Sequence, residues 1–217
     1  MTCSCCSGES LDIFGERSAR RELRRYLRKG LGGDDARQMA GWAEDTGLDG
    51  ATVVEVGGGI GQVQAELLRR GAAQGTVVEV VDAYAGAAAE LARATGIAGK
   101  STFLLADLLE TPEAVEPADI VVLRRVVCCS PDGPALLGAA AGKARRTLLA
   151  SYPRDRVITR AFVRVQNGLF ALLRRRFRVY VHPPGRLEEA ASAHGLRRAR
   201  VARGAIWETV QFEHAPS

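Results

Sequence analysis

The stretch VVEVGGGIG, from Val53 to Gly61, decides the fold of this chain. Its first four residues favour a buried β-strand, its glycines favour a tight turn, and the residues from about Gln62 to Arg70 favour a helix. Glycine adopts positive φ at such a turn and lets a ligand come close to the backbone N–H groups at the start of the helix. We therefore expect a strand, a ligand-binding turn and a helix in succession.

The spacing of these glycines restricts the ligand. A dinucleotide-binding turn has the pattern G-x-G-x-x-G, but its last glycine would fall on Gln62 or Gln64 in this chain. A phosphate-binding P-loop needs Gly-Lys-Ser/Thr, and no lysine lies nearby. The pattern that remains is Glu55-x-Gly57-x-Gly59-x-Gly61. It resembles the first motif of class I S-adenosylmethionine (SAM) methyltransferases.

Length and composition fit one soluble domain. The chain has 217 residues, of which 47% are hydrophobic and 25% charged. No apolar run approaches the roughly 18 residues of a membrane span, and the Cys- and Ser-rich start has no apolar signal sequence. We therefore expect a cytoplasmic protein with reduced thiols, with a flexible tail at residues 1–13 and a single domain at residues 14–217.

Strands and helices alternate along most of the domain. This rhythm, with nearly continuous apolar strands, predicts a parallel sheet covered on both faces. Two helices precede the first strand and two further strands close the chain, an order that resembles class I methyltransferases. The resemblance implies an α/β, Rossmann-like, doubly wound sheet of seven strands, mostly parallel with the last strand antiparallel. We divide the domain into an N-terminal helical cap (14–50), a SAM-binding half (51–151), and a substrate-side insert with a terminal hairpin (152–217).

The insert after the fifth strand is strongly basic. Residues 154–178 hold eight arginines and one acid, a local charge of +7, which leaves −2 for the rest of a chain whose net charge is +5. Within it, residues 155–173 have apolar side chains at helical spacing. We expect this apolar stripe to pack against the domain and to roof the substrate crevice; its members are Ile158, Phe162, Val165 and Leu169.

The resemblance assigns the residues that hold the cofactor. It implies that the turn glycines, Gly58 among them, leave room for SAM, and that Glu55 supports the ammonium group. An acid after the second strand should accept hydrogen bonds from both ribose hydroxyls. Glu79 lies 18 residues beyond Gly61, as the family favours, whereas Asp82 directly precedes a helical run and suits an N-cap. We assign Glu79 to the ribose and Asp82 to the cap, with Asp82 as the competing ribose acid.

The adenine contact is expected after the third strand. By the same resemblance, Asp107 contacts the adenine amino group and the backbone N–H of Leu108 contacts a ring nitrogen. The alternative role for Asp107 is a helix or turn cap.

The loop LRRVVCCSPD, residues 123–132, follows the fourth strand. Ligands of parallel α/β sheets bind at the carboxyl ends of the strands, so this loop should face the transferred methyl group. Arg124 is therefore a candidate for cofactor binding and for catalysis. Tyr152 and His182 each end an extended piece on the same side, and either could orient or deprotonate an acceptor hydroxyl. The alternative for both is a packed or capping side chain, because in-line positioning alone can drive much of a methyl transfer.

All five cysteines fall into two clusters. Thiolates bind soft ions such as Cu(I) and zinc, and also trivalent arsenic. If the N-terminal tail folds over the crevice, the clusters would form a soft-metal or metalloid site; its members are Cys3, Cys5, Cys6, Cys128 and Cys129. The alternative is that the loop cysteines are buried as small hydrophobic residues. We expect one cysteine of the loop to point inward and the other toward the crevice.

The chain also resembles a group of small bacterial methyltransferases. The shared features are an N-terminal Cys pair, a basic helix, a V-V-C-C-x-P-D loop and an S-Y-P-R step. They lie here at Cys5-Cys6, residues 20–26, residues 126–132 and residues 151–154. Members of that group are sometimes labelled after magnesium-protoporphyrin O-methyltransferases.

We therefore predict a SAM-dependent methyltransferase that acts on a small molecule. The alternatives are a thiol-assisted metalloid methyltransferase, an RNA methyltransferase and a SAM-binding module without turnover. Nucleic acid is disfavoured because no series of aromatic residues accompanies the arginines. The basic amphipathic insert fits a weak contact with an anionic membrane surface. The sequence leaves the acceptor and the oligomeric state open.

Overall fold

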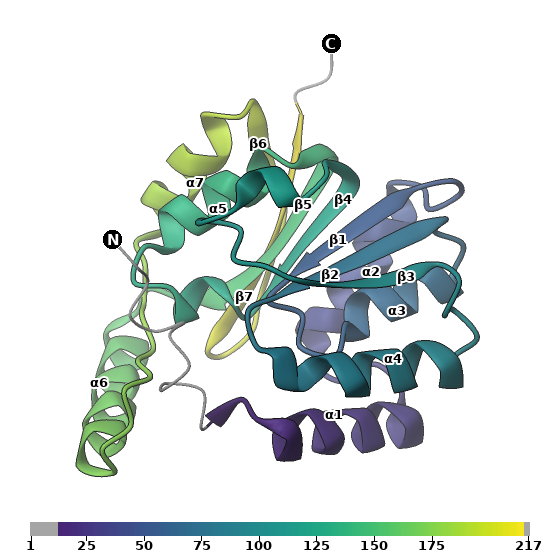
Figure 1. Ribbon diagram of the computed structural model, residues 1–217. Helices are drawn as coiled ribbons and strands as arrows, with labels where there is room; N and C mark the ends of the chain where they lie inside the picture. Colours follow the sequence, from purple (N-terminus) through teal and green to yellow (C-terminus); the bar gives the residue numbers. More distant parts are fainter. Residues whose placement is uncertain (1–12, 215–217) are drawn as a thin grey trace.

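The strand β1 (Thr52–Val56) lies inside a seven-stranded sheet, between β2 and β4, in the computed structural model, which describes residues 13–214 (Figure 1). The strand order is β3-β2-β1-β4-β5-β7-β6. The first five strands are parallel, and β7 runs antiparallel to both β5 and β6. The predicted fold class is therefore confirmed. The other strands are β2 (Gln74–Glu79), β3 (Ser101–Leu105), β4 (Ala118–Arg124), β5 (Ala144–Pro153), β6 (Leu196–Arg203) and β7 (Trp207–His214).

Helices cover both faces of the sheet. Neighbouring residues of β1 point to opposite sides, and both sides are therefore buried. Val53 belongs to the core under α1–α4, whereas Val54 belongs to the core under α5 and α7. The helices are α1 (Glu16–Lys29), α2 (Asp34–Asp45), α3 (Gln62–Arg69), α4 (Ala85–Ala94), α5 (Gly133–Ala141), α6 (Val157–Leu172) and α7 (Pro184–Ser192). Three 3-10 turns complete the order: η2 (Asp82–Tyr84), η3 (Pro112–Ala114) and η4 (Val127–Cys129).

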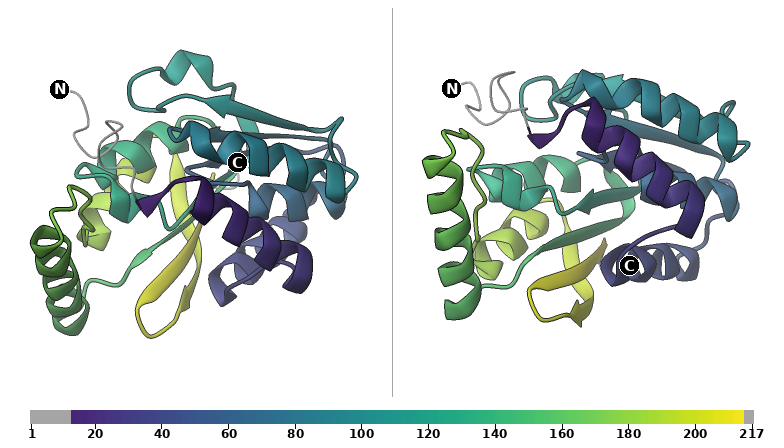
Figure 2. Two further views of the ribbon diagram at one scale, coloured as in Figure 1. Left: turned by 60° about the horizontal axis from the view of Figure 1, so that its bottom comes forward. Right: turned by 90° about the horizontal axis from the view of Figure 1, so that it is seen from below.

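The helix α1 lies across the carboxyl end of the sheet, next to α4 (Figure 2). It buries Ala19, Leu23 and Tyr26 on one side, while arginines occupy most of its exposed surface. It contains residues 20–26, the basic helix expected from the sequence. Since α1 is anchored by these core residues, its other inward-facing residues are held over the ends of β1 and β2.

The helix α6 forms, but its apolar stripe does not pack on the domain. Ile158, Phe162, Val165 and Leu169 are between 53% and 74% exposed, and the buried residues of α6 are Thr159 and Val163. The prediction that this stripe roofs the crevice is therefore wrong. Helical spacing identifies an apolar side of a helix, but it does not say whether another element covers that side. Figure 1 shows α6 standing apart from the sheet, beside the end of β5.

Two sequence predictions concern membranes and the N-terminus. Within residues 13–214, no helix combines the length and the apolar character that crossing a bilayer requires. Of the expected flexible tail, residues 1–13, the structure describes only residue 13. The three cysteines of this tail, Cys3, Cys5 and Cys6, lie outside the described residues.

The first testable prediction concerns Gly61, the N-cap of α3. Its φ is +76°, and an added Cβ would overlap with Cγ2 of Val77. Gly61→Ala should lower the free energy of unfolding by about 2–4 kcal/mol, because left-handed backbone and overpacking each cost about 1 kcal/mol or more. The matched control is Gly86→Ala, since Gly86 is exposed on α4 and no atom lies within 4 Å of its added Cβ. Urea unfolding measures both variants, and equal stability of the two would contradict the packing argument.

Candidate active site

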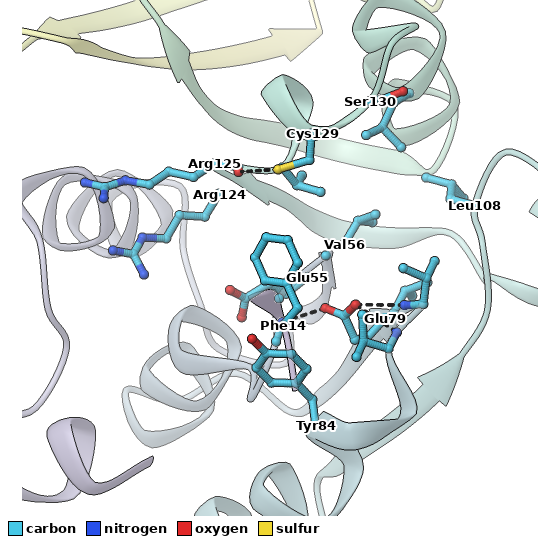
Figure 3. Close-up of a pocket in the computed structure, with 18 of the residues that line it drawn as sticks. Phe14, Glu55, Val56, Glu79, Tyr84, Leu108, Arg124, Arg125, Cys129 and Ser130 are labelled. Atoms are coloured by element: carbon cyan, nitrogen blue, oxygen red, sulfur yellow. Dashed lines mark hydrogen bonds between the residues drawn. The ribbon is translucent and has the colours of Figure 1, made fainter. Parts of the chain in front are cut away.

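A cavity of about 420 Å³ lies at the carboxyl ends of β1, β2 and β4, beneath α1 (Figure 3). The cavity has glycines and carboxylates at the β1 and β2 ends, arginines at the β4 end, and aromatic rings along its rim. Its lining includes Phe14, Glu22, Arg25, Glu55, Gly57, Gly58, Gly59, Gln62, Glu79, Tyr84, Asp107, Leu108, Arg124, Arg125, Val126, Cys129, Ser130 and Phe177. Of the predicted cofactor residues, Gly61 and Asp82 do not line it.

The glycine turn leaves this space open. Gly57 and Gly59 have φ near +60°, which L-residues with a Cβ rarely adopt. A Cβ on Gly57 would overlap with Val126, and a Cβ on Gly59 would lie 3.1 Å from Cε1 of Tyr84 and 3.2 Å from Oε2 of Glu22. A side chain at Gly57 would therefore collide with Val126, and one at Gly59 would crowd Tyr84 and Glu22, all of which line the cavity.

Glu55 is buried at the end of β1 and closes the turn. Its Oε2 accepts a 2.7 Å hydrogen bond from the backbone N–H of Gln64 in the first turn of α3. Burial raises the pKa of Glu55 to about 7, although this bond and the positive charge of Arg124 favour ionisation. A carboxyl group with such a pKa becomes fully ionised when a cation binds beside it.

Glu79 connects the end of β2 to the same turn. One carboxylate oxygen accepts the N–H of Gly59 at 2.9 Å, and the other accepts the N–H groups of Val80 and Val81 at 2.9 and 3.1 Å. Burial still raises the pKa of Glu79 above its ordinary value. A bidentate contact with a ribose would have to replace part of this set of bonds, because a carboxylate accepts about four.

Asp82 does not have the capping role considered for it. It is exposed and does not line the cavity, and the N-cap position of η2 is Val81, with no side-chain capping bond. The predicted cap is therefore wrong. The reason is that Asp82 is the first residue of the 3-10 turn η2. A capping residue stands directly before the first turn, and Val81 has that position here.

Asp107 and Leu108 lie together on the cavity wall beyond β3. Oδ1 of Asp107 accepts a 2.9 Å hydrogen bond from the N–H of Leu109, which is the turn-capping arrangement considered as its alternative role. Turn capping and a contact with adenine are compatible roles for Asp107, because capping uses Oδ1 and an adenine amino group could donate to Oδ2.

The arginines at the end of β4 share one buried acid. Asp35, at the start of α2, accepts hydrogen bonds from Arg124 at 3.1 Å and from Arg125 at 2.8 and 2.9 Å. Burial alone would raise the pKa of Asp35, but the two guanidinium groups lower it below its ordinary value. Arg125 has φ of +55°, and its guanidinium lies 4.6 Å above the ring of Trp207. Figure 3 shows both arginines on the opposite side of the cavity from Glu79 and Leu108.

Glu22 on α1 is a candidate that the sequence analysis missed. It lines the cavity, its Oε2 lies 3.4 Å from Nε2 of Gln62, and burial raises its pKa. The signal was present, because Glu22 is the one acid among the arginines of residues 17–29, beside the core residue Leu23. Arg25, one turn further along α1, lines the cavity near Gly32.

Tyr152 and His182 lie outside the cavity lining, which argues against the predicted catalytic roles. Tyr152 is 2% exposed within the core under α5 and α7, its hydroxyl has no hydrogen-bond partner among the described residues, and burial raises its pKa. The ring of His182 packs beside Gly133, and its Nε2 lies 3.1 Å from the carbonyl oxygen of Ser130. Burial lowers the pKa of His182. Strand ends point to the crevice, but the pleat turns the side chain of Tyr152 into the core under α5 and α7.

The loop cysteines divide as expected. Cys128 is buried, whereas Cys129 lines the cavity, and their sulfur atoms lie 4.0 Å apart. The hydrogen bond to Cys129 lowers the pKa of Cys128 despite burial. No group of three or more His, Cys, Asp or Glu side chains within residues 13–214 is placed to hold a metal ion. The predicted contribution of Cys3, Cys5 and Cys6 lies outside the described residues.

Comparison with known proteins agrees with this geometry. Residues 54–146 match a family described as a methyltransferase domain. Magnesium protoporphyrin IX methyltransferase from Synechocystis PCC 6803, with bound S-adenosylhomocysteine (SAH), superimposes with a TM-score of 0.72 at 19% identity, covering 94% of this chain and 97% of that chain. An O-methyltransferase family protein from Burkholderia thailandensis gives a TM-score of 0.69 at 19% identity, covering 99% and 64%.

A third similar structure is an O-methyltransferase family 2 protein from Planctomyces limnophilus in complex with apigenin, with a TM-score of 0.66 at 17% identity, covering 92% and 62%. A search of curated proteins found no significant match. The domain match together with the fold indicates a SAM-dependent methyltransferase, which confirms the predicted enzyme class and cofactor.

The second testable prediction concerns the ionisation of Glu55. With a pKa of about 7 in the folded protein and 4.5 as its ordinary value, Glu55 binds its proton more tightly in the folded state. The free energy of unfolding should therefore fall as pH rises from about 4.5 to about 7, and then stay level. Glu55→Gln keeps the shape without the charge, so it should be more stable than the wild type at pH ~8 by about 3 kcal/mol and nearly equal at pH ~4.5.

Thermal unfolding at the two pH values measures this difference. Glu22 and Glu79 also have raised pKa values, but they are present in both proteins and cancel in the comparison. Glu110→Gln, at an exposed position, is the control for loss of one carboxylate. A Glu55→Gln effect that is the same at both pH values would contradict the buried ionisation.

Proposed function

We propose that the protein transfers the methyl group of SAM to a small organic molecule that carries an anionic group. The observation that carries this proposal is the division of charge within one cavity. Carboxylates surround the glycine turn at one end, and three arginines with one shared acid form the other end. The first set suits the cation of the cofactor, and the second suits anions.

The cofactor fits the glycine end. Its ammonium group would find Glu55 and Glu22, its ribose Glu79, and its adenine Asp107 and the N–H of Leu108. Gly57 and Gly59 line this end of the cavity, and a Cβ at either position would crowd Val126, Tyr84 or Glu22 of its wall. SAM supplies a methyl group bonded to a positively charged sulfur atom, and the carboxylates of the cavity stabilise that positive charge.

The arginine end has positive charge to spare. Arg124 donates to the carbonyl of Gly32, and the guanidinium of Arg25 also lies beside Gly32. Asp35 compensates one of these three charges, and Glu22 lies close enough to Arg124 and Arg25 to offset part of another. The positive charge that remains suits the carboxylate of SAM and an anionic group of the acceptor.

The chemical step needs positioning more than proton transfer. An acceptor lone pair forms a bond to the methyl carbon, the carbon–sulfur bond breaks in line, and its electron pair stays on the sulfur, giving SAH. Arg124, Arg125, Cys129 and Ser130 lie where they can orient the acceptor. Because Tyr152 and His182 lie outside the cavity lining, we assign the rate enhancement to orientation and exclusion of water.

The same geometry distinguishes this function from its alternatives. A cavity of about 420 Å³ is in the usual range for small ligands, whereas single-stranded nucleic acid needs an open basic groove with stacking rings. Metalloid transfer is not favoured, because the described residues offer only two thiols, Cys128 and Cys129, and one of them is buried.

The third testable prediction compares two neighbouring acids. Glu79→Gln should weaken binding of SAM and SAH roughly 10- to 150-fold, the scale of a lost hydrogen bond to a charged group. Asp82→Asn, three residues away and outside the cavity lining, should leave affinity unchanged. Isothermal titration calorimetry measures both, with thermal unfolding as the check on folding. Binding of NAD without SAM, or an effect of Asp82→Asn alone, would refute the cofactor assignment.

The fourth testable prediction concerns the acceptor. Methyl-labelled SAM is incubated with the protein and a metabolite extract that has been separated into anionic and neutral fractions. Label should enter small molecules of the anionic fraction. Gly59→Val should abolish the transfer, because its side chain fills the cofactor space, and Gly86→Ala should not. Label that enters only RNA or only neutral molecules would contradict the proposed acceptor.

A further inference from the structure

The exposed side of α6 is the most apolar surface of the described chain. Ten large hydrophobic side chains are exposed within residues 13–214, and seven of them lie between residues 157 and 173. Five are spaced so that they form one continuous stripe, which we call the α6 stripe. Its members are Ile158, Phe162, Val165, Leu169 and Leu172. Soluble proteins rarely leave such a contiguous stripe uncovered unless it contacts a partner.

The orientation of α6 is fixed, so its stripe points away from the domain. On the inner side, the Asn167 side chain donates to the carbonyl of Val179 at 2.8 Å and accepts from its N–H at 2.9 Å. Thr159 and Val163 are buried on that side, and Phe170 contacts Phe177 with 6.0 Å between ring centroids. Figure 2 shows α6 at the edge of the molecule in both views.

The charge around the stripe is almost entirely positive. Residues 154–178 carry +7, and their one acid, Asp155, forms a two-bond ion pair with Arg160. Arg156 precedes α6 and Arg164 lies within it, and both are exposed. The segment that carries the apolar stripe is therefore strongly basic, with Arg156, Arg160 and Arg164 at helical spacing on another side of α6 and with no unpaired carboxylate of its own.

From this combination we infer that α6 docks on an anionic lipid bilayer. The stripe enters the boundary between headgroups and acyl chains, and the arginines contact lipid phosphates. A second copy of the chain is a poorer occupant, because a two-fold contact through the stripe would bring two segments of charge +7 together. An acidic lipid surface satisfies both the apolar side chains and the charge.

Docking through α6 also places the cavity rim near the bilayer. Phe177 lines the cavity, contacts Phe170 of α6, and contacts Phe14 with 5.1 Å between ring centroids. The rings thus connect the docking helix to the cavity. Access of an amphipathic acceptor from the bilayer would follow, and that consequence rests on the proposed function, whereas the docking itself does not.

Vesicle co-sedimentation of the full chain tests the docking. The vesicles are phosphatidylcholine alone and phosphatidylcholine mixed with phosphatidylglycerol, each at low and high salt. The wild type should bind the anionic vesicles at least about tenfold more tightly than the neutral ones, and added salt should weaken the binding. A Trp at Phe162 (Phe162→Trp) should shift its emission to shorter wavelength when anionic vesicles are added.

Matched variants separate the two contributions. Ile158→Ser/Phe162→Ser/Leu169→Ser removes the stripe at exposed positions, and Arg156→Gln/Arg164→Gln removes two charges. The first should abolish measurable binding, and the second should weaken it roughly fivefold or more per arginine. Leu27→Ser, which changes an exposed leucine of α1, is the control and should bind as the wild type does. SAM affinity, measured by calorimetry, confirms that each variant is folded, because none of these side chains lines the cavity.

The outcomes that overturn the inference are distinct. Equal binding of the wild type and the stripe variant would show that α6 makes no contact with lipid. Absence of vesicle binding, together with a dimer that the stripe variant dissociates in sedimentation velocity, would show that a second copy covers the stripe. Equally tight binding to neutral and to anionic vesicles would show that the arginines do not contribute to docking. Failure of methyl transfer alone would affect the proposed function and not the docking.

Discussion

Two buried carboxylates hold the turn after β1, and the rest of the site depends on them. Glu55 accepts the N–H of Gln64, and Glu79 accepts the N–H of Gly59, so each ties a strand end to the backbone of the turn or of α3. Burying a carboxylate is costly unless it is hydrogen-bonded, and both groups show that cost as a raised pKa. An apolar pair would give a more stable turn, but it would offer nothing to a cation or a ribose.

A second shared acid organises the opposite end of the cavity. Asp35 is the only carboxylate that contacts both Arg124 and Arg125 in the described residues, and it comes from α2 at the other end of the sequence from β7 and Trp207. The N-terminal helices therefore contribute to the site twice, through Asp35 on α2 and through Glu22 and Arg25 on α1. The division of charge in the cavity therefore depends on α1 and α2, which precede the first strand of the sheet.

The sequence predicted the parts of this site that depend on local pattern. The glycine spacing and the strand-end acids are local, so Glu55, Glu79, Asp107 and Leu108 were found and lie on one cavity, whatever ligand fills it. Features that depend on packing between distant segments were not found. Glu22 reaches the cavity only because α1 lies over β1 and β2, and the pleat of β5 turns Tyr152 into the core. The α6 stripe shows the same limit, since periodicity detects an apolar side but not its neighbour.

The aromatic rim has a consequence for the timing of turnover. Phe14 precedes α1, and Phe177 follows α6, and their rings meet at the cavity edge with an edge-to-face angle of 80°. Moving α1 as a whole would expose Ala19, Leu23 and Tyr26, each a loss of up to about 1–3 kcal/mol of apolar burial, whereas separating two rings costs about 1 kcal/mol. The cheaper path for ligand exchange is rotation of the half-buried Phe14 away from the buried Phe177, while α1 stays in place. Exit of the spent cofactor, and with it the interval between successive cycles, would then be set by one side chain that takes no part in the chemistry.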